Sequence, residues 1–128
     1  MILLWDSSDM TVRLTVTDGE VTHEYEWLAG RELARDMLAY LRDQLAVHGK
    51  TFADIQGIGV FRGPGSYTGL RIGLTVLNTL ASARRIPIVG ATGSTWRDEC
   101  AARLNDGQDD KIVLPEYGGE AHVTKPRK

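Results

Sequence analysis

One stretch decides the fold of this chain: Arg62-Gly63-Pro64-Gly65-Ser66-Tyr67-Thr68-Gly69-Leu70-Arg71-Ile72-Gly73. It follows the apolar run 58–61, which has the length and character of a buried parallel strand. After it, apolar residues recur at helical spacing from Leu70 to Arg84. The glycine-rich stretch is therefore predicted to be a tight turn between a strand and a helix.

Two functions are open for this turn. Ser66 or Thr68 can cap the helix, and its positively polarised end can then hold an anion. Gly63 and Gly65 allow positive φ or close backbone approach, which equally suits packing of the helix on a sheet. The turn lacks the Gly-Lys-Ser/Thr of a Walker A loop and the spacing of the dinucleotide-binding fingerprint. The candidate phosphate-binding residues are Gly63, Gly65, Ser66 and Thr68.

Composition points to a single α/β domain that is expected to be cytoplasmic. A chain of 128 residues with 42% hydrophobic and 25% charged residues is ordinary for a globular protein. A net charge of −2 gives no overall electrostatic attraction to nucleic acid or membrane. Cys100 is the sole cysteine and is expected to be a small packing residue. No apolar run reaches the ~20 residues that span a bilayer, and the first residues do not form a signal peptide.

The rest of the pattern predicts an element order β-β-β-α-β-α-β-α-β, which gives a mixed sheet with helices on its faces. This is the ribonuclease H-like order found in one lobe of the actin-like ATPase superfamily. Residues 1–114 are assigned to that lobe and residues 115–128 to an extended basic tail. The predicted strands are 2–5, 11–17, 20–27, 57–61, 88–91 and 111–114, and the predicted helices are 32–48, 70–84 and 95–104.

The stretch 62–73 closely resembles the signature of the TsaB (YeaZ) family, whose members usually carry Phe where Tyr67 stands. Three other segments agree with that family, and the similarity covers about residues 1 to 100. They are Asp6-Ser7-Ser8 after the first strand, Asp54-Ile55 before the signature strand, and Ile86-Pro87-Ile88-Val89-Gly90 after the helix.

The resemblance implies a non-catalytic subunit in the synthesis of N6-threonylcarbamoyladenosine at position 37 of tRNAs that read codons beginning with A. Such a subunit binds the catalytic subunit TsaD through two long helices, here about 32–48 and 69–84, and the ATPase TsaE joins the complex. Alone, the same surface predicts a homodimer, and tRNA is contacted only indirectly. The expected interface residues are Leu33, Met37, Tyr40, Arg71, Thr75, Asn78 and Thr79.

Two departures from the family pattern limit what is expected. Leu33 stands where family members commonly have His, which weakens any role for a metal. The second lobe of the family is nearly missing, which puts contacts with TsaE in doubt. A lone lobe also cannot form the interlobe cleft in which this superfamily holds nucleotide. No resident cofactor is therefore expected, although residual ATP or ADP binding stays open.

Hydrolytic functions are excluded by the placement of residues. A two-metal nuclease needs several converging carboxylates, and Asp6 alone is predicted at the end of a central strand. A metalloprotease needs clustered ligands, whereas His23, His48 and His122 are scattered. Ser66 has no histidine predicted nearby to act as a base. Asp6 is expected to be a turn or capping residue, or the remnant of a phosphate-and-metal site.

A nucleotide- or tRNA-binding module is the alternative function. The turn Gly63–Gly69 could hold a phosphate, with Arg62 or Arg71 adding positive charge. Basic residues near the chain end could contact tRNA phosphates in a salt-sensitive way, although a solvated terminus that aids solubility is the favoured explanation. Those basic residues are His122, Lys125, Arg127 and Lys128.

Overall fold

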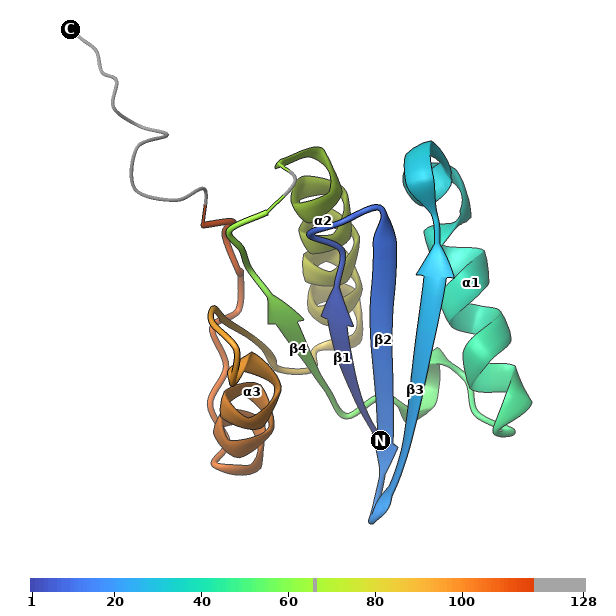
Figure 1. Ribbon diagram of the computed structural model, residues 1–128. Helices are drawn as coiled ribbons and strands as arrows, with labels where there is room; N and C mark the ends of the chain where they lie inside the picture. The colour runs from blue at the N-terminus through green and yellow to red at the C-terminus, as the bar shows by residue number, and fades with distance from the viewer. Residues whose placement is uncertain (66, 117–128) are drawn as a thin grey trace, which may run out of the picture.

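A computed structural model, which describes residues 1–65 and 67–116, contains one five-stranded sheet with strand order β3-β2-β1-β4-β5 (Figure 1). The mixed sheet confirms the predicted α/β class and the order of the first eight elements. The strands are β1 (Ile2–Asp6), β2 (Thr11–Asp18), β3 (Val21–Leu28), β4 (Gly57–Phe61) and β5 (Ile88–Ala91). The helices are α1 (Leu33–Val47), α2 (Tyr67–Arg84) and α3 (Trp96–Asn105), with short 3-10 turns η1 (Gly30–Glu32) and η2 (Phe52–Asp54).

The sheet combines an antiparallel half with a parallel half. Strand β1 pairs antiparallel with β2, placing Leu3 opposite Val16, and parallel with β4, placing Leu3 beside Ile58. Strand β3 is antiparallel to β2, and β5 is parallel to β4. The continuous apolar runs of β1, β4 and β5 are buried on both faces, as expected for strands covered by helices on either side.

Helices α1 and α2 cover one face of the sheet, and α3 covers the other (Figure 1). On the first face, Met37, Leu41 and Leu45 of α1 and Leu74 and Leu77 of α2 enter the main core. On the second face, residues of α3 pack against the two parallel strands and β1 in a smaller cluster. That cluster consists of Leu4, Val89, Ala91, Trp96 and Cys100.

Cys100 is a packing residue, as expected. Its side chain is fully buried, and this burial raises the pKa of the thiol to about 11, although the Val60 backbone and the charge of Arg103 act in the opposite direction. A Cβ at Gly59 of β4 would lie 2.7 Å from the Cβ of Cys100. The absence of a side chain at Gly59 therefore lets α3 approach the sheet closely, and Cys100 packs into this contact. With its raised pKa the thiol stays protonated and is a poor nucleophile.

The predicted strand at 111–114 is wrong, because the structure has no strand there. Residues 109–116, here called the strap, instead run along the edge of β5 and beside α2, held largely by side chains. The Asn78 carboxamide donates to Val113 O and accepts from Val113 N–H, both at 2.9 Å. Carboxylates of Asp109 and Asp110 accept from Ile88 N–H at 3.1 Å and Gly90 N–H at 3.0 Å. Side chains therefore satisfy backbone groups that a sixth strand would have paired.

Asp110 makes the strap sensitive to acid. Partial burial acts to raise the pKa of Asp110, but hydrogen bonds from Arg103 and Gly90 N–H and the positive charges of Arg103 and Arg62 outweigh it, so the pKa lies below its usual value. A carboxyl whose folded pKa is depressed stabilises the fold above its unfolded pKa, near 4, and that stabilisation is lost as pH falls through the folded pKa.

Asp110→Asn is therefore expected to lower the free energy of unfolding by about 1 kcal/mol at pH 7 and by much less near pH 3. Urea unfolding at both pH values measures this difference. Asp43→Asn, at an exposed surface ion pair with Arg42, is the matched control and should change stability little at either pH. An equal loss for Asp110→Asn at both pH values would contradict a role for its charge.

The structure bears on two further sequence-based expectations. No helix within the described ranges is both long and apolar enough to cross a bilayer. Of the predicted tail 115–128, only Pro115 and Glu116 belong to the described residues, and Glu116 N–H donates to Arg62 O at 2.6 Å. The basic residues of that tail, like Ser66, lie outside the described residues.

Candidate functional site

The glycine-rich turn is closely packed against its own chain. Gly63 is buried with φ of 118°, and a Cβ there would lie 2.2 Å from Glu116 O. A Cβ at Gly65 would lie 2.4 Å from the Cβ of Ser8 in the loop after β1. Thr68 is exposed in the first turn of α2. This geometry favours the packing function of the two glycines over an anion site beside them.

A short chain of buried hydrogen bonds fixes the start of α2 on β1. Trp5 Nε1 donates to Ser7 Oγ at 2.9 Å, and Ser7 Oγ donates to Gly69 O at 2.9 Å. Sequence reasoning placed Ser7 only in a polar turn and missed this function. Asp6 is a turn residue, as expected, because its carboxylate accepts from the N–H and the hydroxyl of Ser8 at 2.9 and 2.6 Å.

Helices α1 and α2 lie side by side and present one continuous outer surface, here called the α1–α2 face. Leu38 of α1 is 51% exposed on this surface, which is unusual for a large apolar residue in mid-helix. Ile72 and Val76 of α2 are only partly buried, and Thr75 and Thr79 are exposed. The exposed parts of α1 and α2 therefore combine apolar and small polar groups with charged side chains, among them the ion-paired Arg35 and Arg42.

The predicted interface residues divide into buried and exposed groups. Leu33 and Met37 are 4% and 0% exposed, so they face the sheet, and their placement on an outer surface is wrong. Tyr40 is half-buried and stacks on Trp27 of β3 with ring centroids 4.3 Å apart. Burial raises the pKa of the Tyr40 hydroxyl, and the nearby Tyr25 adds a smaller effect in the same direction. The Asn78 carboxamide is hydrogen-bonded to the backbone of Val113 in the strap. The exposed members are Arg71, Thr75 and Thr79.

The sequence pattern groups Leu38 with Leu33, Met37, Leu41 and Leu45 as apolar positions at helical spacing, and Leu38 was therefore not predicted to be an interface residue. The buried positions of α1 follow a strict four-residue spacing, Leu33, Met37, Leu41 and Leu45. A residue one position after Met37 lies about 100° further around the helix and outside this stripe. The signal was therefore present as an apolar residue that breaks the four-residue spacing.

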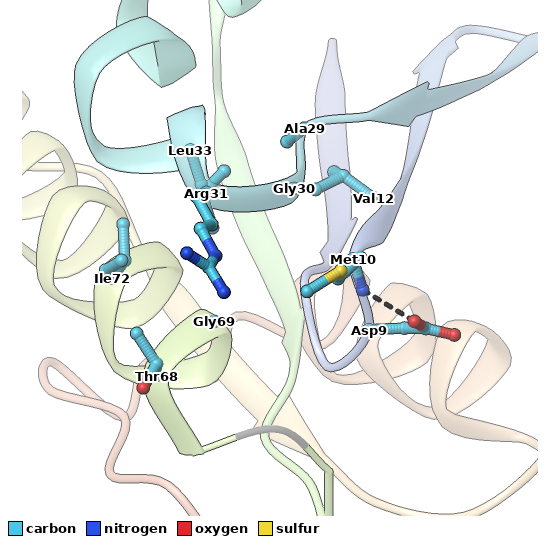
Figure 2. A pocket seen from close by; sticks show the side chains of 10 residues that line it. All are labelled: Asp9, Met10, Val12, Ala29, Gly30, Arg31, Leu33, Thr68, Gly69 and Ile72. Carbon is cyan, nitrogen blue, oxygen red and sulfur yellow. Dashed lines mark hydrogen bonds between the residues drawn. The ribbon is translucent and has the colours of Figure 1, made fainter.

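A cavity of about 340 Å³ lies where α1 and α2 begin (Figure 2). Its walls come from the loop after β1, from η1, and from the first turns of both helices. Figure 2 shows the Arg31 side chain extending from η1 toward the first turns of α2. No motif in the sequence indicated this cavity, since its lining comes from three separated segments. The lining residues are Asp9, Met10, Val12, Ala29, Gly30, Arg31, Leu33, Thr68, Gly69 and Ile72.

Two of the three histidines meet at the C-terminal end of α1. The rings of His23 and His48 are stacked with centroids 4.0 Å apart, and the Tyr25 hydroxyl forms a hydrogen bond with His48 Nε2. The sequence did not predict this contact, and His122 lies outside the described residues. Among the residues that the structure describes, no group of three or more His, Cys, Asp or Glu could hold a metal ion.

Comparisons with known proteins agree on one biosynthetic system. A family model described as "TsaD: tRNA N6-adenosine threonylcarbamoyltransferase" matches residues 27–93. The chain is 33% identical over 109 residues to the tRNA threonylcarbamoyladenosine biosynthesis protein TsaB of Escherichia coli K12, covering 78% of this chain and 47% of that protein. It is 40% identical over 63 residues to the tRNA N6-adenosine threonylcarbamoyltransferase of Pelobacter propionicus, covering 49% of this chain and 18% of that enzyme.

The structural comparison gives the same lobe. YeaZ from Pseudomonas aeruginosa superimposes with a TM-score of 0.68 at 24% sequence identity, covering 83% of this chain and 49% of that one. This likeness establishes the ribonuclease H-like fold of the lobe. The chain thus spans about half the length of the TsaB relatives and YeaZ structures that it matches.

Proposed function

This chain belongs to the TsaB (YeaZ) family, of which it matches about half a full-length member, and from that membership we propose that it is a non-catalytic scaffold subunit in tRNA N6-threonylcarbamoyladenosine synthesis. In this proposal the α1–α2 face binds the catalytic TsaD subunit and stabilises its active arrangement. The modified position is adenosine 37, and the subunit contacts tRNA only through the complex.

The observation that carries the proposal is the exposed α1–α2 face. Leu38 is 51% exposed and lies about 200° around α1 from Tyr40, which stacks on Trp27 of the edge strand β3, so Leu38 is directed away from β3. On α2, Ile72 and Val76 are partly buried, and Thr75 and Thr79 are exposed. Small side chains let a second pair of helices approach closely, and exposed leucine gains free energy when a partner covers it. An interface of standard size buries about 1,600 Å² in total, which two helices of this length can supply.

Four side chains of the described residues that could act in catalysis are occupied in packing or local hydrogen bonds, which supports the non-catalytic part of the proposal. Cys100 is buried with a raised thiol pKa. The Asp6 carboxylate is used by Ser8, and the histidines His23 and His48 stack on each other. We propose accordingly that the chain needs no cofactor of its own.

Size-exclusion chromatography with light scattering, for the chain alone and mixed with TsaD of the same organism, tests the proposal. We expect a stable heterodimer, and we expect the isolated chain to form a homodimer through the same face. Calorimetry of the mixture gives the dissociation constant. Adding the ATPase TsaE shows whether it joins a complex that contains this chain. A chain that elutes separately from TsaD at micromolar concentration would refute the scaffold function.

The alternative proposal, a nucleotide- or tRNA-binding module, has less support. Gly63 and Gly65 are packed against Glu116 and Ser8, and the Arg62 side chain donates to Leu114 O at 2.9 Å. These contacts occupy Gly63, Gly65 and Arg62, three of the groups that were expected to surround a phosphate.

We therefore expect no saturable binding of ATP to the isolated chain below millimolar concentration, measured by calorimetry at moderate salt. The same titration with unmodified tRNA is expected to show only weak, salt-sensitive binding. Saturable binding of either ligand in the micromolar range would favour the module over the scaffold.

A further inference from the structure

We propose that the cavity at the beginning of α1 and α2 receives an acidic side chain of the catalytic partner, and that Arg31 is its cationic anchor. The inference rests on the proposed docking of TsaD and names one contact within it. The cavity shares Thr68 and Gly69 with the glycine-rich stretch but does not include Gly63 or Gly65. The inference depends on the lining of the cavity, on Arg31, which is unpaired among the described residues, and on the position of both at the start of α1 and α2.

The size of the cavity suits a side chain better than a cofactor. Its volume of about 340 Å³ lies at the lower limit of small-molecule sites, which span roughly 300–1,000 Å³. Much of its wall is apolar, with Met10, Leu33 and Ile72 on three sides (Figure 2). Apolar walls reduce the competition of water, so a charged group held there interacts more strongly with a charge of opposite sign.

Arg31 is the charge that lacks its counterpart. Within residues 1–65 and 67–116, the Arg31 guanidinium has no hydrogen bond or ion pair, although it lines the cavity. The nearest carboxylate in the lining, Asp9, accepts from the N–H of Met10, and in Figure 2 it points away from Arg31. Six other arginines of the described residues have partners, namely Arg13, Arg35, Arg42, Arg62, Arg97 and Arg103. Within the same ranges, Arg84 and Arg85 resemble Arg31 in having no side-chain partner, but they lie at the opposite end of α2 and do not line this cavity.

A carboxylate is the group that this arrangement fits. A guanidinium presents a planar fork of N–H donors that matches the two oxygens of a carboxylate. Thr68 also lines the cavity, but in Figure 2 its hydroxyl points away from Arg31, so the guanidinium is the donor that faces the cavity. Desolvated arginines paired across an interface are frequent sites of large binding energy.

The position of the cavity points to a protein as the source of the carboxylate. Exposed Arg31 lies in η1, which directly precedes α1, and partly buried Ile72 lies in the first turns of α2, so the cavity adjoins the start of both helices of the α1–α2 face. A partner covering that face also covers the cavity. An Asp or Glu projecting from the partner surface would enter it without a change in the backbone of this chain.

The test compares the affinity of TsaD for four forms of the full chain: wild type, Arg31→Ala, Arg31→Lys and Arg35→Ala. Arg35 is the matched control, because it is an exposed arginine near the same helix end and is already paired with Glu32 and Asp36. Calorimetry at low and moderate salt gives each dissociation constant, and urea midpoints confirm that the variants are folded.

We expect Arg31→Ala to weaken binding by about 10- to 100-fold and to reduce its salt dependence. Arg31→Lys should recover only part of the loss, because an ammonium group lacks the bidentate fork. Arg35→Ala should remain within about threefold of wild type. A partner Asp or Glu whose alanine variant shows the same loss, with no further loss in combination with Arg31→Ala, would identify the occupant.

Three results would overturn the inference, and they differ in whether the proposed scaffold function survives. Tight wild-type binding with Arg31→Ala unchanged removes the anchor and leaves the scaffold function intact. Inorganic phosphate that binds the isolated chain through Arg31, without any effect of Arg31→Ala on TsaD affinity, assigns the cavity to a free anion. Absence of binding between the wild-type chain and TsaD removes both proposals.

Discussion

Gly73→Ala is expected to destabilise the fold by about 2–3 kcal/mol, although alanine is intrinsically the better helix former by about 1 kcal/mol. A Cβ at this position would lie 2.3 Å from Ser7 Oγ and 2.6 Å from Trp5 Nε1. Both atoms belong to the hydrogen-bonded chain that fixes α2 on β1, and Ser7 and Trp5 are 2% and 1% exposed. Neither side chain can move aside without leaving a buried polar group unpaired.

Urea unfolding followed by circular dichroism measures this loss, which is large against the 5–15 kcal/mol of a typical domain. Thr75→Ala is the matched control, because it makes the same residue type at an exposed position of the same helix. It should change stability by no more than about 0.5 kcal/mol. If Gly73→Ala proved as stable as wild type, α2 would not approach β1 as closely as the structure indicates.

The sequence predicted elements whose own residues specify them. Continuous apolar runs identified β1, β4 and β5, and alternation of apolar and polar residues identified β2. The apolar positions of α1 and α2 recur at helical spacing, so both helices were predicted to within a few residues. The glycine-rich stretch was correctly placed as a strand-to-helix turn, because its flanking patterns change period on either side of it.

The features that were missed depend on contacts between distant residues. The sequence of the strap predicts a strand from Lys111 to Leu114, but carboxylates of Asp109 and Asp110 accept hydrogen bonds from the edge of β5. Asn78 was placed on the interface because it lies on an outer part of α2, and only the fold brings Val113 to its carboxamide. Arg31 had no pattern around it, since the cavity is assembled from three separated segments.

The sequence predicted the wrong rotational orientation of α1 about its axis, and this error has the largest functional consequence. Met37 was expected on the interface and is completely buried, whereas Leu38 was not expected there and is half-exposed. A shift of one residue in a helix changes the direction of a side chain by about 100°. The position suited to a binding variant is therefore Leu38, because Met37→Asp would place a carboxylate in the core and damage the fold itself.

Leu38→Asp is expected to weaken TsaD binding by at least about 100-fold, which corresponds to about 3 kcal/mol. The change removes an apolar side chain from the middle of the α1–α2 face and leaves an unpaired carboxylate to be desolvated when a partner covers it. The fold should survive, because Leu38 is 51% exposed and aspartate in a helix costs less than about 1 kcal/mol relative to leucine. Calorimetric titration with TsaD measures the change.

Val47→Asp is the matched control, since it makes the same apolar-to-acidic change on the same helix at a residue that is 72% exposed. Val47 precedes His48, which contacts Tyr25 and His23 of β3, so this end of α1 is directed to the edge of the sheet rather than to α2. A general effect of negative charge would weaken both variants alike. If TsaD docks on the α1–α2 face, Leu38→Asp should lose binding and Val47→Asp should keep it. Equal affinities of TsaD for the two variants would place the partner on another surface.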